Sequence, residues 1–205
     1  LIGSGVVDRL CDWLEFKDAS LGHNNPKPEF DALRCSDIGN GAVFAHQHFQ
    51  VLRYCYDLGQ WLGWNGSVWV PDATATVDRL AETSVRSFPA EAEAIKDSGD
   101  REELLKWALR SGSRQRIKAM VDQAKHRMRI DQDRLDADPM LINVGGAAIN
   151  LENGSSRPPE TVDYCTKQAA VDYDADAKCP LWLAFLDRIM NGSAELISYV
   201  QRAVG

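Results

Sequence analysis

The residues best suited to chemistry in this chain are lysines and arginines gathered in one stretch. Residues 101–129 contain nine lysines and arginines against three acids, so this window carries a charge of +6. The whole chain has a net charge of −7, and the remainder therefore carries −13. Such an asymmetry permits a local anion-binding face on an acidic body, although it argues against a globally basic nucleic-acid binder.

Helical spacing groups four of these cations on one side. At 100° per residue they fall within about 60° of one another and span about 22 Å, and they are Arg114, Lys118, Lys125 and Arg129. Arg110 ends the helical segment before them. A stripe of this kind could follow a phosphate backbone, and Trp61, Trp64 and Trp69 could stack on bases. The alternative is a solvated helix face with the three tryptophans in the core, and the spacing by itself favours that alternative.

Nucleotide-binding and catalytic motifs are not found. The dipeptide Gly-Lys of a phosphate-binding P-loop does not occur, and Gly3-Ser4-Gly5 lacks the third glycine of a dinucleotide fingerprint. The acids of "DQDRLDAD" crowd into eight residues (131–138), which is typical of a turn and not of a two-metal site. None of the four histidines has an identifiable catalytic partner. We therefore expect no catalytic residue and no cofactor.

Metal binding is not indicated either. The five cysteines are an odd number and form no CxxC pair. Both a zinc site and a disulfide framework would need closer or paired spacing. His46 and His48 are two residues apart, so on a helix their side chains would point to different sides. No run of apolar residues is long enough to span a membrane, and no signal peptide is present, so we expect a cytoplasmic protein without membrane contact. The chain begins with Leu1, which suggests a processed or truncated amino end.

The elements that must position these residues can be predicted from periodicity. We expect a short helix over residues 5–16, a linker, a helix over 40–50 and a strand at 52–56. Asn65-Gly66 lies between apolar alternations and predicts a type I′ hairpin in which Trp64 faces Ser67 and Leu62 faces Trp69. One face would then carry Leu62, Trp64 and Trp69 and the other Trp61, Val68 and Val70. The hairpin is then either buried on both sides or exposes one aromatic face.

Three helices should follow. The first is ended or kinked at Pro89. Gly112 would close the second as a left-handed cap, and Ser113 would cap the start of the third. A second hairpin turns at Gly145-Gly146, and two closing helices start at Pro180 and after Asn191-Gly192-Ser193. We therefore predict an α+β fold, mostly α-helical with two β-hairpins. It would be a single compact domain with a short N-terminal helical extension.

Several stretches, in order, resemble one family. They are Asp37-Ile38-Gly39-Asn40 with Phe44, Arg53-Tyr54, the hairpin "WNGSVW" (64–69), "LDADPMLINV" (135–144) and the closing helices from Asp174. Together they are similar to the D-five amino-terminal-like domain that precedes the helicase in phage, plasmid and poxvirus primase–helicases. Gly145-Gly146 in place of an Asn-Gly turn, and Pro89 within a helix, depart from the family pattern. The resemblance covers residues 37–205 and leaves 1–36 as an N-terminal helix and linker.

The resemblance implies a non-catalytic module in DNA replication. Its place would be upstream of a superfamily 3 ATPase motor, in a parent that is an ATP-dependent DNA helicase with or without primase. The expected partners are single-stranded or forked DNA and the adjacent helicase and primase domains, with a homo-oligomer formed through the parent. The role would be DNA engagement or coupling of priming to unwinding. The alternative is a protein-interaction or oligomerisation collar without DNA affinity.

Overall fold

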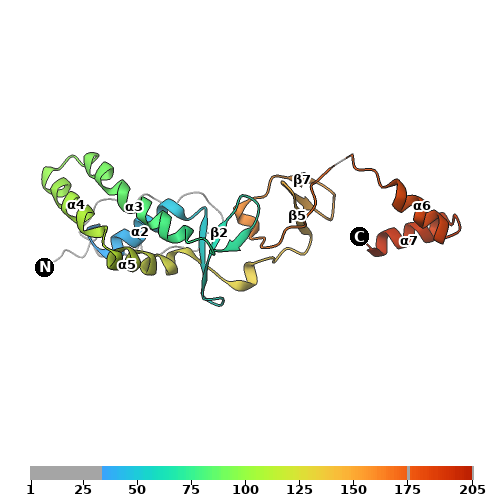
Figure 1. Ribbon diagram of the computed structural model, residues 1–205, viewed down its shortest axis with the longest axis horizontal. Coiled ribbons are helices and arrows are strands. Elements are labelled where there is room, and N and C mark those ends of the chain that lie inside the picture. Colours follow the sequence, from blue (N-terminus) through green and yellow to red (C-terminus); the bar gives the residue numbers. More distant parts are fainter. Residues whose placement is uncertain (1–33, 175, 205) are drawn as a thin grey trace. The chain divides into compact units, whose positions relative to one another are not determined.

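The computed structural model describes residues 34–174 and 176–204 (Figure 1). The chain forms two compact units, Leu1–Val171 and Asp172–Gly205, which we call the large unit and the hairpin unit. The helix predicted over residues 5–16 lies outside the described residues. The predicted domain boundary between residues 36 and 37 is not tested by the structure and stays a prediction.

The large unit combines helices with two small antiparallel-rich sheets (Figure 1). Its helices are α2 (Asp37–His48), α3 (Thr76–Glu93), α4 (Ser98–Ser111) and α5 (Arg114–Ala124). The first sheet has the order β3-β2-β1-β4, from β1 (Leu52–Cys55), β2 (Gln60–Trp64), β3 (Trp69–Pro71) and β4 (Arg129–Ile130). The second has the order β5-β6-β7, from β5 (Leu141–Val144), β6 (Ala147–Asn150) and β7 (Ser156–Arg157). Short 3₁₀ turns are η1 (Lys125–Met128), η2 (Gln132–Arg134) and η3 (Thr161–Asp163).

The hairpin unit consists of α6 (Pro180–Ile189) and α7 (Ala194–Val204). Asn191 and Gly192 between the helices both have positive φ, 51° and 72°. The Ser193 hydroxyl then accepts from the Leu196 amide at the start of α7. Both closing helices and their capping turn are therefore confirmed. With helices and sheets in one chain, the predicted α+β class is confirmed as well.

Helix starts follow the capping signals of the sequence. Ser36, Asp97 and Ser113 each accept a backbone N–H at the first turn of α2, α4 and α5. The left-handed cap predicted at Gly112 is wrong, because Gly112 has φ −72° and passes directly to the Ser113 cap. Pro89 does not end its helix, since α3 continues to Glu93.

The hairpin between β2 and β3 has another register than predicted. Trp64 pairs with Trp69 instead of Ser67, across a loop of four residues. The Asn65 side chain shapes this loop, because its Oδ1 accepts from the amides of Ser67 and Val68, both at 2.9 Å. The shift is by two residues, so each side chain keeps its predicted face. By contrast, the predicted turn at Gly145-Gly146 is confirmed, with Val144 opposite Ala147.

The first sheet has packed side chains on both faces, with Trp61 and Trp64 half-buried. Leu62 and Trp69 belong to a small core cluster with Cys55 and Ile130, and Trp64 packs against it. Trp61, on the other face, packs against the main core cluster formed largely by α2, α3 and α5. The first of the two possibilities for this hairpin is therefore the observed one. No helix among the described residues is long and apolar enough to cross a membrane.

Candidate nucleic-acid interface

Three of the predicted phosphate-contacting cations lie at the junction of α4 and α5. Arg110 is in the last turn of α4, Arg114 is the first residue of α5, and Lys118 follows one turn later. All three are exposed. None has an ion-pair partner among the residues that the structure describes. Arg114 and Lys118 are four residues apart and therefore share one helix face.

Lys125 and Arg129 do not continue this face as predicted. Helix α5 ends at Ala124, Lys125 opens the 3₁₀ turn η1, and Arg129 lies in β4. A 3₁₀ turn advances about 120° per residue, so the single 22 Å helical stripe is wrong. Both cations are also neutralised locally. Lys125 lies 2.8 Å from Asp122, and Arg129 donates to Asp131 at 2.7 Å.

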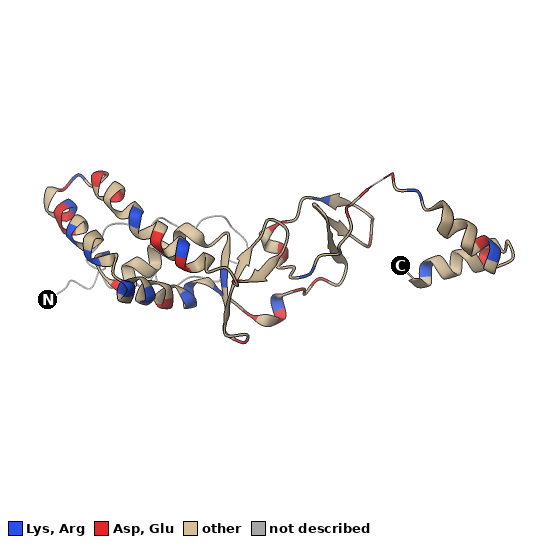
Figure 2. Ribbon diagram, viewed as in Figure 1, with Lys and Arg blue, Asp and Glu red and all other residues tan. Residues whose placement is uncertain are grey.

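Hydrogen bonds to these carboxylates raise the pKa of both Lys125 and Arg129, which keeps them charged but paired. The remaining cations of the basic window are engaged as well. Arg101 donates to the Ile95 carbonyl, Lys106 pairs with Glu102, and Arg116 pairs with Asp37. Arg127 is buried. Arg101 is hydrogen-bonded to a neutral carbonyl, and the other accessible cations of the window without a carboxylate partner among the described residues are Arg110, Arg114 and Lys118. In Figure 2, blue bands follow α4 and α5, with red ones among them.

The tryptophans lie mostly in the core. Trp69 is 1% exposed, and its Nε1 donates to the Thr161 carbonyl at 2.9 Å, so it offers no face to a base. Trp61 is half-buried, edge-to-face with Tyr54 at 5.2 Å. Trp64 is half-buried and tilted against Trp69 at 5.7 Å. Any stacking role is thus limited to the exposed parts of Trp61 and Trp64.

The more exposed aromatic side chain in this region is Tyr56, at the turn between β1 and β2. It is 51% exposed and edge-to-face with Tyr54 at 4.8 Å. The Lys125 ammonium lies 4.9 Å from the Tyr54 ring. Sequence reasoning did not single out these tyrosines, although the polar turn that follows them was a signal of exposure.

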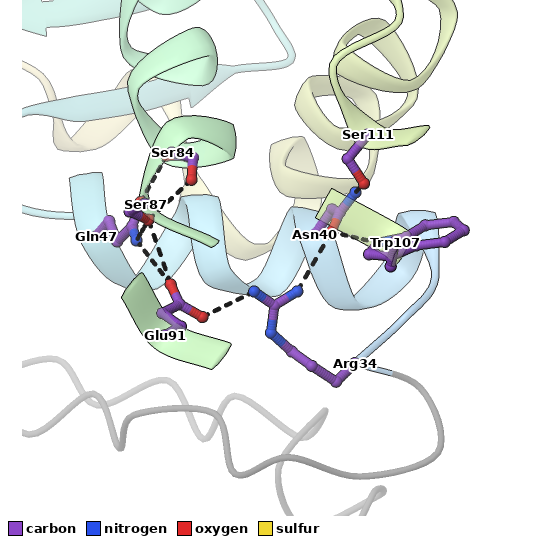
Figure 3. Close-up of polar contacts among 8 residues, drawn as sticks. All are labelled: Arg34, Asn40, Gln47, Ser84, Ser87, Glu91, Trp107 and Ser111. Atoms are coloured by element: carbon purple, nitrogen blue, oxygen red, sulfur yellow. Dashed lines mark hydrogen bonds and ion pairs between the residues drawn. The ribbon is translucent and has the colours of Figure 1, made fainter. Parts of the chain in front are cut away.

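A buried polar network positions the α4–α5 junction (Figure 3). Asn40 in α2 donates to the Ser111 hydroxyl and accepts from the Trp107 indole, each at 3.0 Å. Arg34 donates to Asn40 at 3.3 Å and pairs with Glu91 of α3 at 2.8 Å. The network thus ties α2 to α3 and to the end of α4, where Arg110 lies.

Arg116 links the start of α5 to the start of α2 and to Trp107. Its guanidinium pairs with Asp37 at 3.2 Å and lies 4.2 Å from the centre of the Trp107 ring. Cation–π contacts of this kind stabilise by about 0.5–1 kcal/mol at partly exposed sites. The helix junction that carries Arg110, Arg114 and Lys118 is therefore held both by the Asn40 network and by the contacts of Arg116.

The structure places one histidine beside a hydroxyl, which the sequence did not indicate. His48 Nε2 lies 2.9 Å from Ser84 Oγ. Ser84 is buried, however, and its hydroxyl donates to Gln47, so it is not presented as a nucleophile. In the acidic segment, Asp138 accepts from the Met140 amide, as expected of a turn, whereas Asp136 accepts from the amide of Thr166, 30 residues further along the chain. No cluster of metal-ligating groups occurs among the described residues.

Comparison with known families places the chain in a biological setting. The family model described as "D5 N terminal like" matches residues 42–191, which is 150 of the 205 residues. The chain belongs to the D5 N-terminal-like family. Domains of this family are non-catalytic N-terminal domains of primase–helicases, and the setting is therefore DNA replication. No curated protein matches the chain.

Proposed function

We propose that this D5 N-terminal-like domain helps a replicative primase–helicase to engage DNA, through Arg110, Arg114 and Lys118. The supporting observation is that these three exposed cations lie at one helix junction without carboxylate partners among the described residues, whereas the other cations of the basic window are paired, buried or, for Arg101, hydrogen-bonded to a backbone carbonyl. Phosphate groups are the anions that such clustered side chains recognise. In this proposal the domain lies upstream of a superfamily 3 motor and couples it to priming.

Fluorescence anisotropy with labelled single-stranded and duplex DNA, over a salt series, tests this proposal. The double variant Arg114→Ala with Lys118→Ala should bind single strands more weakly. Each lost phosphate contact should reduce the magnitude of the log-affinity slope against log salt by about 0.7, so by about 1.4 for two.

The matched control is Arg79→Ala with Arg86→Ala, which removes two exposed cations from α3. This control changes the net charge by the same amount. Because Arg79 and Arg86 lie on α3 and not at the α4–α5 junction, it should leave the salt slope near the wild-type value. Absence of any binding at low salt would rule out the DNA-engaging role. An equal loss of DNA affinity in both double variants would show that the effect comes from net charge and not from a specific site.

A second candidate function, an oligomerisation collar, is supported by the hairpin unit. Leu186 is its one buried side chain among those described, whereas Leu181 is 86%, Phe185 51% and Tyr199 63% exposed. Helix α6 is apolar except for Asp187 and Arg188, and such helices are covered on more than one side. Over α6 and α7 the charges balance, with two acids and two arginines, so a second copy would not be repelled.

Light scattering over a micromolar concentration series tests the collar. Leu181→Glu should shift an oligomer toward monomer, because it places a charge in the apolar face. Leu109→Glu is the control, because Leu109 on α4 is also 86% exposed but lies in the large unit. A strict monomer at all concentrations excludes self-association through this face.

A further inference from the structure

Two arginines of the large unit are equally buried but differently compensated. Arg34 and Arg53 are each 4% exposed. Arg34 has the Glu91 carboxylate at 2.8 Å. Arg53, in β1, has no carboxylate partner among the described residues, and its Nη1 donates to the Leu52 carbonyl at 2.7 Å. A buried positive charge without an anion is costly, so its surroundings require an explanation.

Aromatic rings supply part of the compensation. The Arg53 guanidinium carbon lies 3.6 Å from the centre of the Phe49 ring and 5.3 Å from that of Trp69. Trp69 in turn stacks on Tyr164, with ring centres 6.3 Å apart and planes inclined by 29°. Tyr164 thereby lies next to the ring that the Arg53 guanidinium contacts. Ring faces attract cations, but they carry no net negative charge.

A second arginine adds positive charge at the same tyrosine. The guanidinium carbon of Arg134, in η2, lies 4.9 Å from the centre of the Tyr164 ring. Arg134 is exposed and has no ion pair among the described residues. Burial lowers the pKa of Arg53, Tyr164 partly offsets this, and the positive charge of Arg134 lowers the pKa further. The two guanidinium groups therefore repel each other across Tyr164.

Two of the acids near this cluster have other partners. Asp131 binds Arg129, and Asp136 accepts from both the amide and the hydroxyl of Thr166. Tyr164 itself is held in place, because its carbonyl accepts from the Asp136 amide and its backbone adopts a left-handed conformation at φ 48°. The arrangement is thus fixed, while neither Arg53 nor Arg134 forms an ion pair within the part of the chain that the structure describes.

We propose that Arg53, Tyr164 and Arg134 form a phosphate-binding site separate from the α4–α5 junction. Arg134 supplies the direct contact, and the buried Arg53 supplies the fixed positive charge behind Tyr164. Arginine is suited to this role because its fork matches the oxygens of a phosphate. Where the phosphate belongs to DNA, the inference rests on the proposed function; a free phosphate or nucleotide would satisfy the same chemistry.

Thermal unfolding of the full chain in phosphate and in chloride, at equal ionic strength and pH, is the first test. A ligand that binds only the folded state raises the Tm, by about 3–6 °C for a chain of this size at ten times its Kd. Phosphate also stabilises proteins non-specifically. The decisive quantity is therefore the rise in Tm from chloride to phosphate, compared between Arg134→Ala and the control Arg86→Ala. Arg86 is an exposed arginine on α3. The specific rise should be lost in Arg134→Ala, kept in Arg86→Ala and partly restored in Arg134→Lys.

Equal Tm shifts in wild type, Arg134→Ala and Arg86→Ala would overturn the site. DNA anisotropy with the same variants then identifies the source of the phosphate. A weaker affinity of Arg134→Ala for single strands, with a smaller salt slope, assigns the site to the DNA backbone. If phosphate protects the wild type specifically but no DNA binds, the site is one for a free phosphate or nucleotide. In that case the proposed function fails while this inference stands.

Discussion

At the scale of single residues, buried charge is compensated unevenly in this domain. Arg34 lies over the Phe88 ring at 4.4 Å and is paired with Glu91, whereas exposed pairs such as Arg86–Glu82 lie in solvent. Removing one partner of a buried pair leaves the other charge without compensation. Removing one partner of an exposed pair costs little, because water and salt already screen the interaction.

The Arg34–Glu91 pair should therefore contribute measurably to stability. We expect Glu91→Ala to lower the free energy of unfolding by about 2–3 kcal/mol, since it leaves the buried Arg34 guanidinium without its carboxylate partner. Glu82→Ala, on the same helix, should cost less than about 0.5 kcal/mol. Urea unfolding followed by circular dichroism measures both free energies. Equal losses would show that the buried pair stabilises the fold no more than the exposed one.

His48 should make stability depend on pH. Burial lowers the pKa of its imidazole below the ordinary value. The unfolded chain therefore binds the proton more readily than the folded one, and the free energy of unfolding falls as the pH drops below about 6.5.

His48→Gln should flatten this dependence between pH 6.5 and 5, because glutamine does not titrate and still reaches Ser84 as a donor. The pKa of His126 is lowered too, by partial burial and by the charge of Arg127. This side chain is nevertheless exposed to solvent. His126→Gln should consequently change the slope less. Urea titrations at several pH values measure these slopes, and an unchanged slope in His48→Gln contradicts the assignment.

At the scale of elements, the close approach of α2 to α5 depends on Gly41. A Cβ atom there would lie 2.6 Å from the Gln123 Cβ. Gly41→Ala should therefore destabilise by about 1–3 kcal/mol through overpacking, despite the better helix propensity of alanine. The effect should reach the basic junction, which α5 carries.

Gly112→Ala is the matched control for this substitution. Gly112 has φ −72°, and its nearest neighbouring atom would be 3.9 Å from the added Cβ. The change should be neutral or stabilise by up to about 1 kcal/mol, since it restricts the unfolded chain. Tm values of both variants test the pair, and a large loss in Gly112→Ala would contradict the observed cap geometry.

At the scale of the whole molecule, the buried cores belong to one unit. Both hydrophobic clusters are formed by residues of the large unit, whereas the hairpin unit contributes Leu186 to the buried set. We expect a chain ending at Val171 to fold and to unfold cooperatively, with a Tm within about 3 °C of the full chain. This follows because the buried apolar area that drives folding is retained.

Near-ultraviolet circular dichroism reports on this truncation, because five of the six tryptophans precede residue 171. Loss of the tertiary signal or aggregation of the truncated chain would show that the large unit depends on the hairpin unit. The same chain serves the collar test, since it lacks α6 and α7 and should remain monomeric.

The sequence by itself determined where several helices and turns of this domain begin, and which side of a strand each of its side chains occupies. Ser113 begins α5 and Gly145-Gly146 turns a hairpin, because capping and two-residue turns are decided by neighbouring residues. The motifs at Asp37–Asn40 and residues 64–69 also indicated the family, which the match over residues 42–191 confirms. Even the misjudged hairpin register preserved the side-chain faces, because alternation along a strand has a period of two.

Only the tertiary structure decided which charged and aromatic side chains remain accessible. Trp69 and Lys125 fitted the pattern of an interface, yet one is buried against Thr161 and the other is paired with Asp122. Arg53 and Arg134 are 81 residues apart in sequence, yet Arg53 lies over Trp69, which stacks on Tyr164, and Arg134 lies over that same tyrosine. Burial and ion pairing depend on contacts between residues distant in the chain, and helical spacing describes only neighbours on one element. For that reason only three of the five predicted phosphate-contacting cations, Arg110, Arg114 and Lys118, remain at one site in the folded domain.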